Sequence, residues 1–348
     1  MDHSISSKSI GIILLNLGSP DTPEPRSIRR FLAHFLADKR VIQLPRILWL
    51  PILYGFILPF RPQKIAPLYR SIWGPGDGPM RSTGYKLALA LEEKLSSLSQ
   101  STDYSYHVVT GMTYGNPSLQ LAFKSLNERG CGEIIILPLF PQYSDTSTAA
   151  AFDSVASALK KVQVNSSLHF INHYYSHPLY INALVSQIQK HSEATGIDFN
   201  NKKTNTKLLM SFHGIPQSYA DKGDPYPQHC EITAKLVFKK LAEKLNCSEQ
   251  EFAFSYQSRF GKTAWLKPYT DHLLEDWGKN GVEQVSIICP GFTVDCLETL
   301  EEIAIQNKEI FQNAGGEIYH YIPALNDGND HVDLLVDIVN SKISEIQD

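Results

Sequence analysis

The sequence predicts an α/β protein made of two Rossmann-like domains, each built on a doubly wound parallel sheet. Short apolar runs that end in Gly or Pro turns alternate with amphipathic stretches, which is the pattern of parallel strands joined by helices. The chain has 348 residues, more than one hydrophobic core usually serves. The same layout of strand, Pro/Gly loop and helix recurs in the two halves, so two similar domains are expected.

Strands and helices alternate along the chain in this prediction. The expected strands are short apolar runs closed by turn residues. They cover residues 11–17, 107–112, 133–139, 167–173, 207–212, 252–257 and 284–289. Segments with helical periodicity cover residues 82–100, 118–129, 148–161, 178–195, 230–245, 269–280, 295–313 and 331–346.

The repeated layout also sets the domain boundaries. The first domain is expected over residues 1–173 and the second over residues 174–322, with a last helix in 323–348 packing back on the first. Open α/β sheets bind ligands beyond the carboxyl ends of their strands, so a cleft formed by those loops of both domains is expected. A nucleotide is not supported as the ligand, because the chain has no G-x-G-x-x-G motif or P-loop.

Composition excludes several classes of protein. The formal net charge is −4 and no long Lys/Arg tract is present, which argues against a nucleic-acid partner. The 5 cysteines form no C-x-x-C pair, so neither a disulfide framework nor a structural zinc site is indicated. The first apolar run, residues 11–17, is too short for a signal peptide. A reducing compartment, the cytoplasm, is therefore expected.

The apolar segment 41–60 is the strongest membrane candidate in the sequence. Pro45, Pro51 and Pro59 interrupt it, so it does not suit a spanning helix. Basic residues flank it and aromatic residues are common in and after it. Two interpretations stay open. One is a buried helix and loop, and the other is an amphipathic lip that makes loose peripheral contact with the inner face of the cell membrane or covers a large apolar ligand.

The apolar run 208–212 leads directly into His213, which is followed by the loop-forming residues Gly214 and Pro216. His213 therefore lies where a buried strand ends, the place at which α/β sheets carry their chemistry. A neutral imidazole can accept a proton or bind a divalent transition metal. A histidine that only caps the end of the strand fits the same pattern equally well.

Acidic residues open the helix expected over residues 295–313. On a helix, Asp295, Glu298 and Glu302 are three and four residues apart and would line one face. The alternative is a capping box of Asp295 and Glu298, which would leave Glu301 and Glu302 as ordinary surface acids. The loop before this helix comes directly after a predicted strand, and so does the loop that begins at His213. Both loops are therefore expected to open onto the same cleft.

These segments resemble the motifs of the ferrochelatases, the enzymes that complete haem synthesis. The stretch SFHGIPQSYADKGDPYP, around His213, resembles the histidine signature of that family. Other blocks between residues 11 and 321 resemble its remaining motifs, in family order: LLNLGSPDTP, GMTYGNPS, LPLFPQYSDTSTA, YQSRFGKTAWLKPYT and CPGFTVDCLETLEEI. The fold that the resemblance implies, two Rossmann-like domains with a porphyrin cleft between them, agrees with the predicted layout.

The resemblance implies an enzyme that inserts Fe2+ into protoporphyrin IX and releases two protons. His213 matches the histidine of the family motif and Glu298 the glutamate that faces it, so both are implied as catalytic residues and metal ligands. Glu302 and Asp295 match an acidic path for protons or metal. The residues implied to bind the porphyrin are Tyr114, Trp265, Phe292, Arg70, Tyr143 and Ser144. A chelatase acting on coproporphyrin, or a non-catalytic carrier of tetrapyrrole or metal, is the alternative.

Fe2+ is thus implied as a substrate, and no permanently bound cofactor is expected. Cys296 stands where other members carry a histidine and Leu17 where some carry a methionine, so neither is assumed to bind metal. The iron–sulfur cluster of certain members needs cysteines in a C-terminal extension. This chain has no cysteine after Cys296, so no cluster is expected. The division of labour between His213 and Glu298, for protons and for iron, stays open.

Overall fold

The computed structural model describes residues 8–98, 104–200, 204–245, 247–248, 251–261 and 263–347. Its contacts divide the chain into two compact units. The first comprises Met1–Phe140, Asp145–His173 and Asp327–Asp348, and the second comprises Pro141–Ser144 and Tyr174–Asn326. The last two residues of the helix predicted over 82–100 lie outside the described residues.

The first unit contains a parallel four-stranded sheet in the order β2-β1-β3-β4. Its central strand is the apolar run at the N-terminus, and side chains on both faces of this strand are buried. That explains why the run is apolar without alternation, as expected for a parallel strand covered on both sides. The strands are β1 (Lys8–Asn16), β2 (Tyr104–Met112), β3 (Glu133–Pro138) and β4 (Ser167–Phe170).

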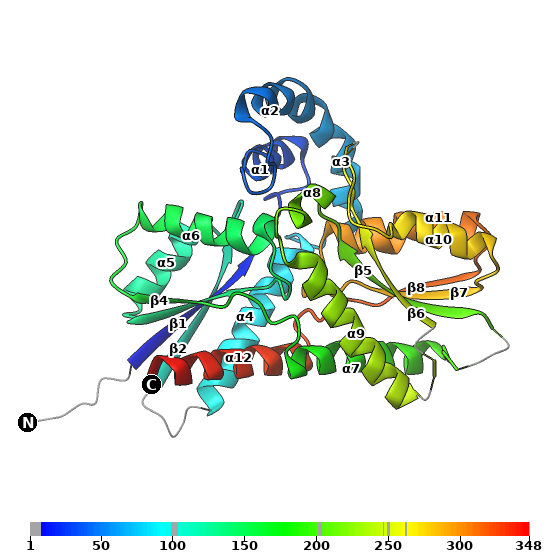
Figure 1. The fold of residues 1–348 in the computed structure, drawn as a ribbon. Coiled ribbons are helices and arrows are strands. Elements are labelled where there is room, and N and C mark those ends of the chain that lie inside the picture. Colours follow the sequence, from blue (N-terminus) through cyan, green and yellow to red (C-terminus); the bar gives the residue numbers. More distant parts are fainter. Residues whose placement is uncertain are drawn as a thin grey trace, which may run out of the picture. The chain divides into compact units, whose positions relative to one another are not determined.

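The second unit contains a second parallel sheet, in the order β6-β5-β7-β8. Its strands are β5 (Thr206–His213), β6 (Phe252–Gln257), β7 (Gln284–Ile288) and β8 (Ile318–Tyr321). In both sheets the first strand of the unit lies between the second and the third, and the fourth lies at an edge (Figure 1). The predicted fold class, two doubly wound domains of similar layout, is confirmed.

Two strands differ from the prediction. The strand expected over 167–173 ends at Phe170, which pairs with Ile136 of β3, and the hydrogen bond that follows this pair runs from Ile171 N to Ile136 O. Strand β8 was not predicted. It has only four residues, and its burial pattern does not follow a simple alternation, since the exposed Ile318 and the buried Tyr319 are followed by two half-buried residues.

Helices cover the sheets. In the first unit, α5 and α6 pack against β1 and β3 around the fully buried Phe123 and Val155. Helix α12 contacts α4, where Asp333 accepts a hydrogen bond from Lys94. The helices of the first unit outside the apolar segment are α1 (Pro25–Leu36), α4 (Pro79–Leu98), α5 (Leu119–Glu128), η2 (Asp145–Ala149), α6 (Ala150–Leu159) and α12 (Asn329–Gln347). Those of the second are α7 (Pro178–Thr195), α8 (Gln217–Ala220), α9 (Tyr226–Leu245), α10 (Thr270–Lys279), η4 (Glu298–Asn307) and α11 (Lys308–Asn313).

The apolar segment predicted as a lip or a buried helix forms three consecutive helical pieces, α2 (Arg46–Ile52), η1 (Leu53–Ile57) and α3 (Leu58–Ile72). One side of it is anchored, because Trp49 is buried and its indole N–H donates to Leu36 O at 2.6 Å. The other side carries exposed apolar side chains, which we call the apolar lip: Leu44, Ile47, Leu48, Ile52, Tyr54, Phe56 and Phe60. Among the described residues, no helix has the length and apolar character needed to cross a bilayer.

Candidate functional site

His213 is the last residue of β5, beside Gln257, the last residue of β6. Its Nδ1 lies 2.6 Å from the carbonyl oxygen of Gly214. A carbonyl oxygen can only accept, so Nδ1 carries the proton of this hydrogen bond and Nε2 of the neutral ring keeps a free lone pair. The hydrogen bond to Gly214 is what a histidine that caps the strand end would form. The same bond leaves Nε2 available as a base or a metal ligand.

Two of the predicted aromatic residues lie next to His213. The ring centroids of Phe292 and His213 are 6.2 Å apart. Trp265 pairs with Pro216 in an isolated antiparallel bridge, and its indole N–H donates to Phe260 O at 2.9 Å. A Cβ at Gly214 would lie 3.3 Å from the Trp265 ring, so the glycine lets the indole approach the loop that follows His213.

The acidic residues lie on η4, a π-helix with i→i+5 hydrogen bonds, a form that is rare and often marks functional sites. This helix starts at Glu298, so Asp295 lies before it and not on its face, and the predicted stripe of three acids is wrong for Asp295. No side chain caps the helix start, and therefore the alternative of a capping box is also wrong. Gln257 Nε2 donates to the main-chain oxygen of Glu298 at 2.9 Å, which ties the start of η4 to the strand beside His213.

The carboxylate of Glu302 accepts two hydrogen bonds from Ser258. Ser258 donates its N–H to Glu302 Oε1 at 2.8 Å and its hydroxyl to Glu302 Oε2 at 2.5 Å. Burial raises the pKa of Glu302, the hydrogen bonds from Ser258 and the nearby His213 lower it, and the charge of Glu298 raises it, with a net shift upward. Three groups of the predicted site, His213, Glu298 and Glu302, are therefore electrostatically linked within the second unit.

Glu301 points elsewhere. It is buried, and both of its carboxylate oxygens accept from Gln306 Nε2, at 2.9 and 2.7 Å. The interpretation of Glu301 and Glu302 as ordinary surface acids is wrong, because the first is buried and the second is half-buried.

Asp295 has a dense set of donors. Its Oδ1 accepts from Thr299 Oγ1 at 2.8 Å and from the Tyr321 hydroxyl, and its Oδ2 accepts from Asn326 Nδ2 at 2.7 Å. The carboxylate is buried, so these bonds supply the stabilisation that water would otherwise give. Asp295 thus fastens the loop before η4 to β8 and to the segment that follows it.

Cys296 is buried close to two acidic residues. Its side chain is buried, and burial together with the charges of Glu298 and Asp295 raises the pKa of the thiol well above its usual value. The thiolate is the form that binds metals, and it is strongly disfavoured here. In the absence of a metal ion the side chain is therefore a neutral thiol, and no metal-binding role is assigned to it.

The other predicted porphyrin-binding residues have hydrogen-bond or ion-pair partners outside this group. Tyr114, in the first unit, is buried and donates its hydroxyl to Asp38 Oδ2 at 2.7 Å. Burial and the Asp38 carboxylate raise the pKa of Tyr114. Arg70 is exposed at the end of α3 and forms an ion pair with Glu24 at 3.0 Å.

Tyr143 and Ser144 belong to the segment assigned to the second unit. The main-chain N–H of Tyr143 donates to His229 Nδ1 at 3.2 Å, and the Ser144 hydroxyl donates to Asp224 Oδ2 at 2.8 Å. The hydroxyl proton of Ser144 is therefore engaged in a hydrogen bond within the protein.

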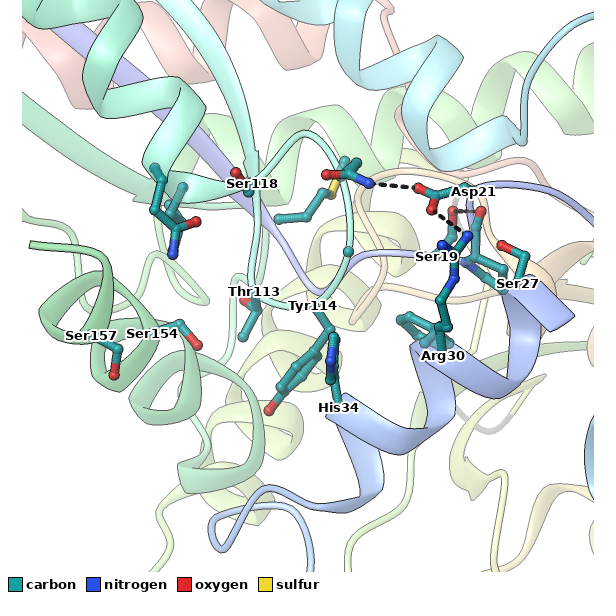
Figure 2. Close-up of a pocket in the computed structure, with 17 residues that line it drawn as sticks. Ser19, Asp21, Ser27, Arg30, His34, Thr113, Tyr114, Ser118, Ser154 and Ser157 are labelled. Atoms are coloured by element: carbon teal, nitrogen blue, oxygen red, sulfur yellow. Dashed lines mark hydrogen bonds and ion pairs between the residues drawn. The ribbon is translucent and has the colours of Figure 1, made fainter. Parts of the chain in front are cut away.

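Tyr114 also lines a cavity of about 390 Å³ in the first unit. Figure 2 shows serine and threonine side chains around it, with Asp21 linked by dashed lines to its neighbours. Asp21 accepts from Asn116 Nδ2 at 3.0 Å and pairs with Arg30 at 3.4 Å and Arg81 at 3.3 Å. Of the predicted site residues, only Tyr114 is among the residues that line this cavity.

Sequence reasoning missed Gln257 and Ser258 as site residues. The available signal was their place at the end of a predicted strand, since neighbouring parallel strands end at one edge of a sheet. Within the described residues, no three His, Cys, Asp or Glu side chains converge on a point that could hold a metal ion. The chemistry that the geometry offers is therefore one imidazole lone pair beside two linked carboxylates.

Comparisons with known proteins give a consistent result. The sequence model of the family described as ferrochelatase matches residues 9–343. The ferrochelatase of Acinetobacter baylyi is 46% identical over 337 residues, covering 97% of this chain and 95% of that protein. The ferrochelatase of Vibrio parahaemolyticus is 46% identical over 333 residues, covering 96% of this chain and 98% of that protein.

Among solved structures, SirB from Bacillus subtilis with Fe3+ is similar with a TM-score of 0.54. The match covers 96% of this chain and 95% of that chain at 10% sequence identity. A likeness at this identity concerns the fold alone, and it agrees with the two parallel sheets described above.

Proposed function

This chain belongs to the ferrochelatase family, and on that premise we propose that it inserts Fe2+ into protoporphyrin IX to form protohaem, the last step of haem biosynthesis. In this reaction two pyrrole N–H bonds break, four nitrogens bind the iron, and two protons leave. Fe2+ is a substrate, and the protein needs groups that accept protons and groups that guide a divalent ion.

The single observation that carries the proposal is the placement of His213. Its Nδ1 proton is committed to Gly214 O, so Nε2 is the acceptor. The Glu302 carboxylate interacts electrostatically with His213 and with Glu298. An imidazole lone pair suits a pyrrole proton or a transition metal, and carboxylates suit protons and hard divalent ions.

The aromatic residues beside His213 suit a flat macrocycle. The Phe292 ring lies 6.2 Å from the imidazole, centroid to centroid, and the Trp265 ring packs against Gly214, the residue after the histidine. A porphyrin held between such surfaces can be bent toward the geometry in which its nitrogen lone pairs point out of the plane, which favours the transition state over the planar substrate. Tyr114, Arg70, Tyr143 and Ser144 are proposed as further porphyrin contacts on the family resemblance.

The decisive experiment is a metal-insertion assay with the purified chain. We expect turnover with Fe2+ under anaerobic conditions, and with Zn2+ as a fluorescent readout, and a higher kcat/KM for protoporphyrin IX than for coproporphyrin. Binding of porphyrin without insertion of metal would identify a carrier and contradict the proposal. A reversed preference would keep the chelatase activity and replace the substrate by coproporphyrin.

We also propose that the apolar lip makes peripheral contact with a membrane surface, from which an apolar porphyrin can enter. Ile47 is 84% exposed and Phe56 is 69% exposed, although both sit in a helical segment that is anchored on its other side. Clustered exposed apolar side chains of this kind mark interaction surfaces, and flanking Lys39 and Lys64 suit anionic headgroups.

Replacing Ile47 and Phe56 by serine is expected to lower the partition constant of the protein for anionic phospholipid vesicles, measured by flotation, by about 30-fold or more, because the two changes together remove roughly 2–4 kcal/mol of apolar transfer. The matched control is Leu121→Ser, which alters an isolated side chain that is 58% exposed on α5. If the wild-type chain does not float with vesicles, or if both variants float alike, the lip has no role at membranes.

A further inference from the structure

Two consecutive residues at the end of β6, Gln257 and Ser258, contact both acids of the proposed site. Gln257 is buried and lies opposite His213 in the register of the sheet. Its main-chain oxygen accepts from Gly214 N at 2.8 Å, so the end of β6 is tied to the residue that binds His213 Nδ1.

The side chain of Gln257 reaches in the other direction, toward η4. Its Oε1 accepts from Ser211 Oγ at 2.8 Å, a residue of the same strand as His213. With the oxygen fixed in this way, Nε2 is the atom that faces Glu298, and it donates to Glu298 O at 2.9 Å. One amide therefore connects the histidine strand to the first residue of the acidic helix.

Ser258 contacts the second acid, Glu302. Its two donors meet the two oxygens of one carboxylate, which fixes the carboxylate in orientation as well as in position. This arrangement requires an unusual backbone, because Ser258 has a φ of 64°, in the left-handed region that non-glycine residues rarely adopt.

The second non-glycine residue with positive φ in the described part of the chain supports this view. Asn326 has a φ of 49° and donates Nδ2 to Asp295 Oδ2 at 2.7 Å, while its Oδ1 accepts from Asp295 N at 2.9 Å. Both left-handed residues thus hold a carboxylate at or just before η4. Strained backbone of this kind persists where the surroundings impose it, and it clusters at active sites.

We propose that Gln257 and Ser258 are positioning residues that set Glu298 and Glu302 relative to His213 during metal insertion. The inference rests on the proposed function and adds to it the elements that hold its acids in place. Transfer of a proton or a metal ion between these groups depends on separations held to fractions of an ångström. Gln257 fixes the start of η4 through the main chain, and Ser258 fixes the Glu302 carboxylate through its side chain.

The test is Ser258→Gly, assayed for metal insertion into porphyrin. Glycine adopts positive φ without strain and keeps the main-chain N–H, so only the hydroxyl bond to Glu302 is removed. We expect kcat to fall about tenfold while the KM for porphyrin and the thermal midpoint stay close to wild type, because one charge-assisted hydrogen bond is lost away from the binding surface.

The matched control is Ser192→Ala on α7 of the same unit. Ser192 is half-buried, as Ser258 is, and its hydroxyl donates to Ile197 O, which belongs to neither β6 nor η4, so its loss is expected to lower the thermal midpoint and to leave kcat unchanged. A second variant, Gln257→Glu, replaces the donor that faces Glu298 O by an acceptor and is expected to lower kcat further.

The outcomes separate this inference from the proposed function. Wild-type turnover tests the function by itself. If the wild type inserts metal and Ser258→Gly matches it in kcat, the positioning role is wrong while the function stands. An equal loss of kcat in Ser258→Gly and Ser192→Ala would also overturn the inference, since the effect would then come from the loss of any half-buried serine hydroxyl in this unit.

Discussion

His213→Ala is expected to lower kcat for metal insertion by about 100- to 10,000-fold, the range that one positioned general acid or base contributes. The variant removes the free Nε2 lone pair and leaves the loop otherwise supported, because Gly214 N still donates to Gln257 O. The KM for porphyrin is expected to change little, since Trp265 and Phe292 remain. Zinc insertion followed by fluorescence, and anaerobic iron insertion followed by absorbance, both report this loss.

The control for this variant is His272→Ala. His272 is an exposed histidine of α10 in the same unit, where it contacts Arg259 and the Tyr269 ring. Removing it should leave kcat unchanged, which excludes a general effect of losing an imidazole. Turnover of His213→Ala within threefold of wild type would show that Nε2 neither accepts a pyrrole proton nor binds the metal in the slow step.

The sequence predicted the position of His213 because a strand end is a local feature. An apolar run followed by Gly and Pro marks the end of a strand, and parallel strands bring their carboxyl ends to one edge of a sheet. The same reasoning extends to Gln257, which ends the neighbouring strand opposite His213. It was missed because a glutamine at a strand end carries no chemical signature of its own.

The start of the acidic helix could not be predicted in the same way. Spacings of three and four residues suggested an α-helix with Asp295, Glu298 and Glu302 on one face, but η4 is wound as a π-helix from Glu298. Its position is fixed by contacts from distant parts of the sequence, including Gln257 and Ser258. Short-range periodicity contains no information about such partners. Strand β8, whose Tyr321 donates a hydrogen bond to Asp295, was missed for the same reason.

For Asp295, the family resemblance and the geometry suggest different roles. The resemblance implies a path for protons or metal, whereas the structure surrounds its buried carboxylate with donors from Thr299, Tyr321 and Asn326. Asp295→Ala is expected to lower the free energy of unfolding by about 3 kcal/mol, because several buried donors lose their acceptor at once. Denaturant unfolding measures this change.

A residue exchange decides between the two roles. In Asp295→Asn alone, the new NH2 group would face the NH2 group of Asn326. Two donors cannot form a hydrogen bond with each other, so stability is expected to fall. Adding Asn326→Asp restores a donor–acceptor pair in the reverse direction, and aspartate also tolerates the left-handed backbone found at position 326. If Asp295 only holds the loop before η4, the double variant regains both stability and turnover. If its carboxylate conducts protons or metal, stability returns but kcat stays low, because the double variant carries the carboxylate at position 326 and an amide at position 295.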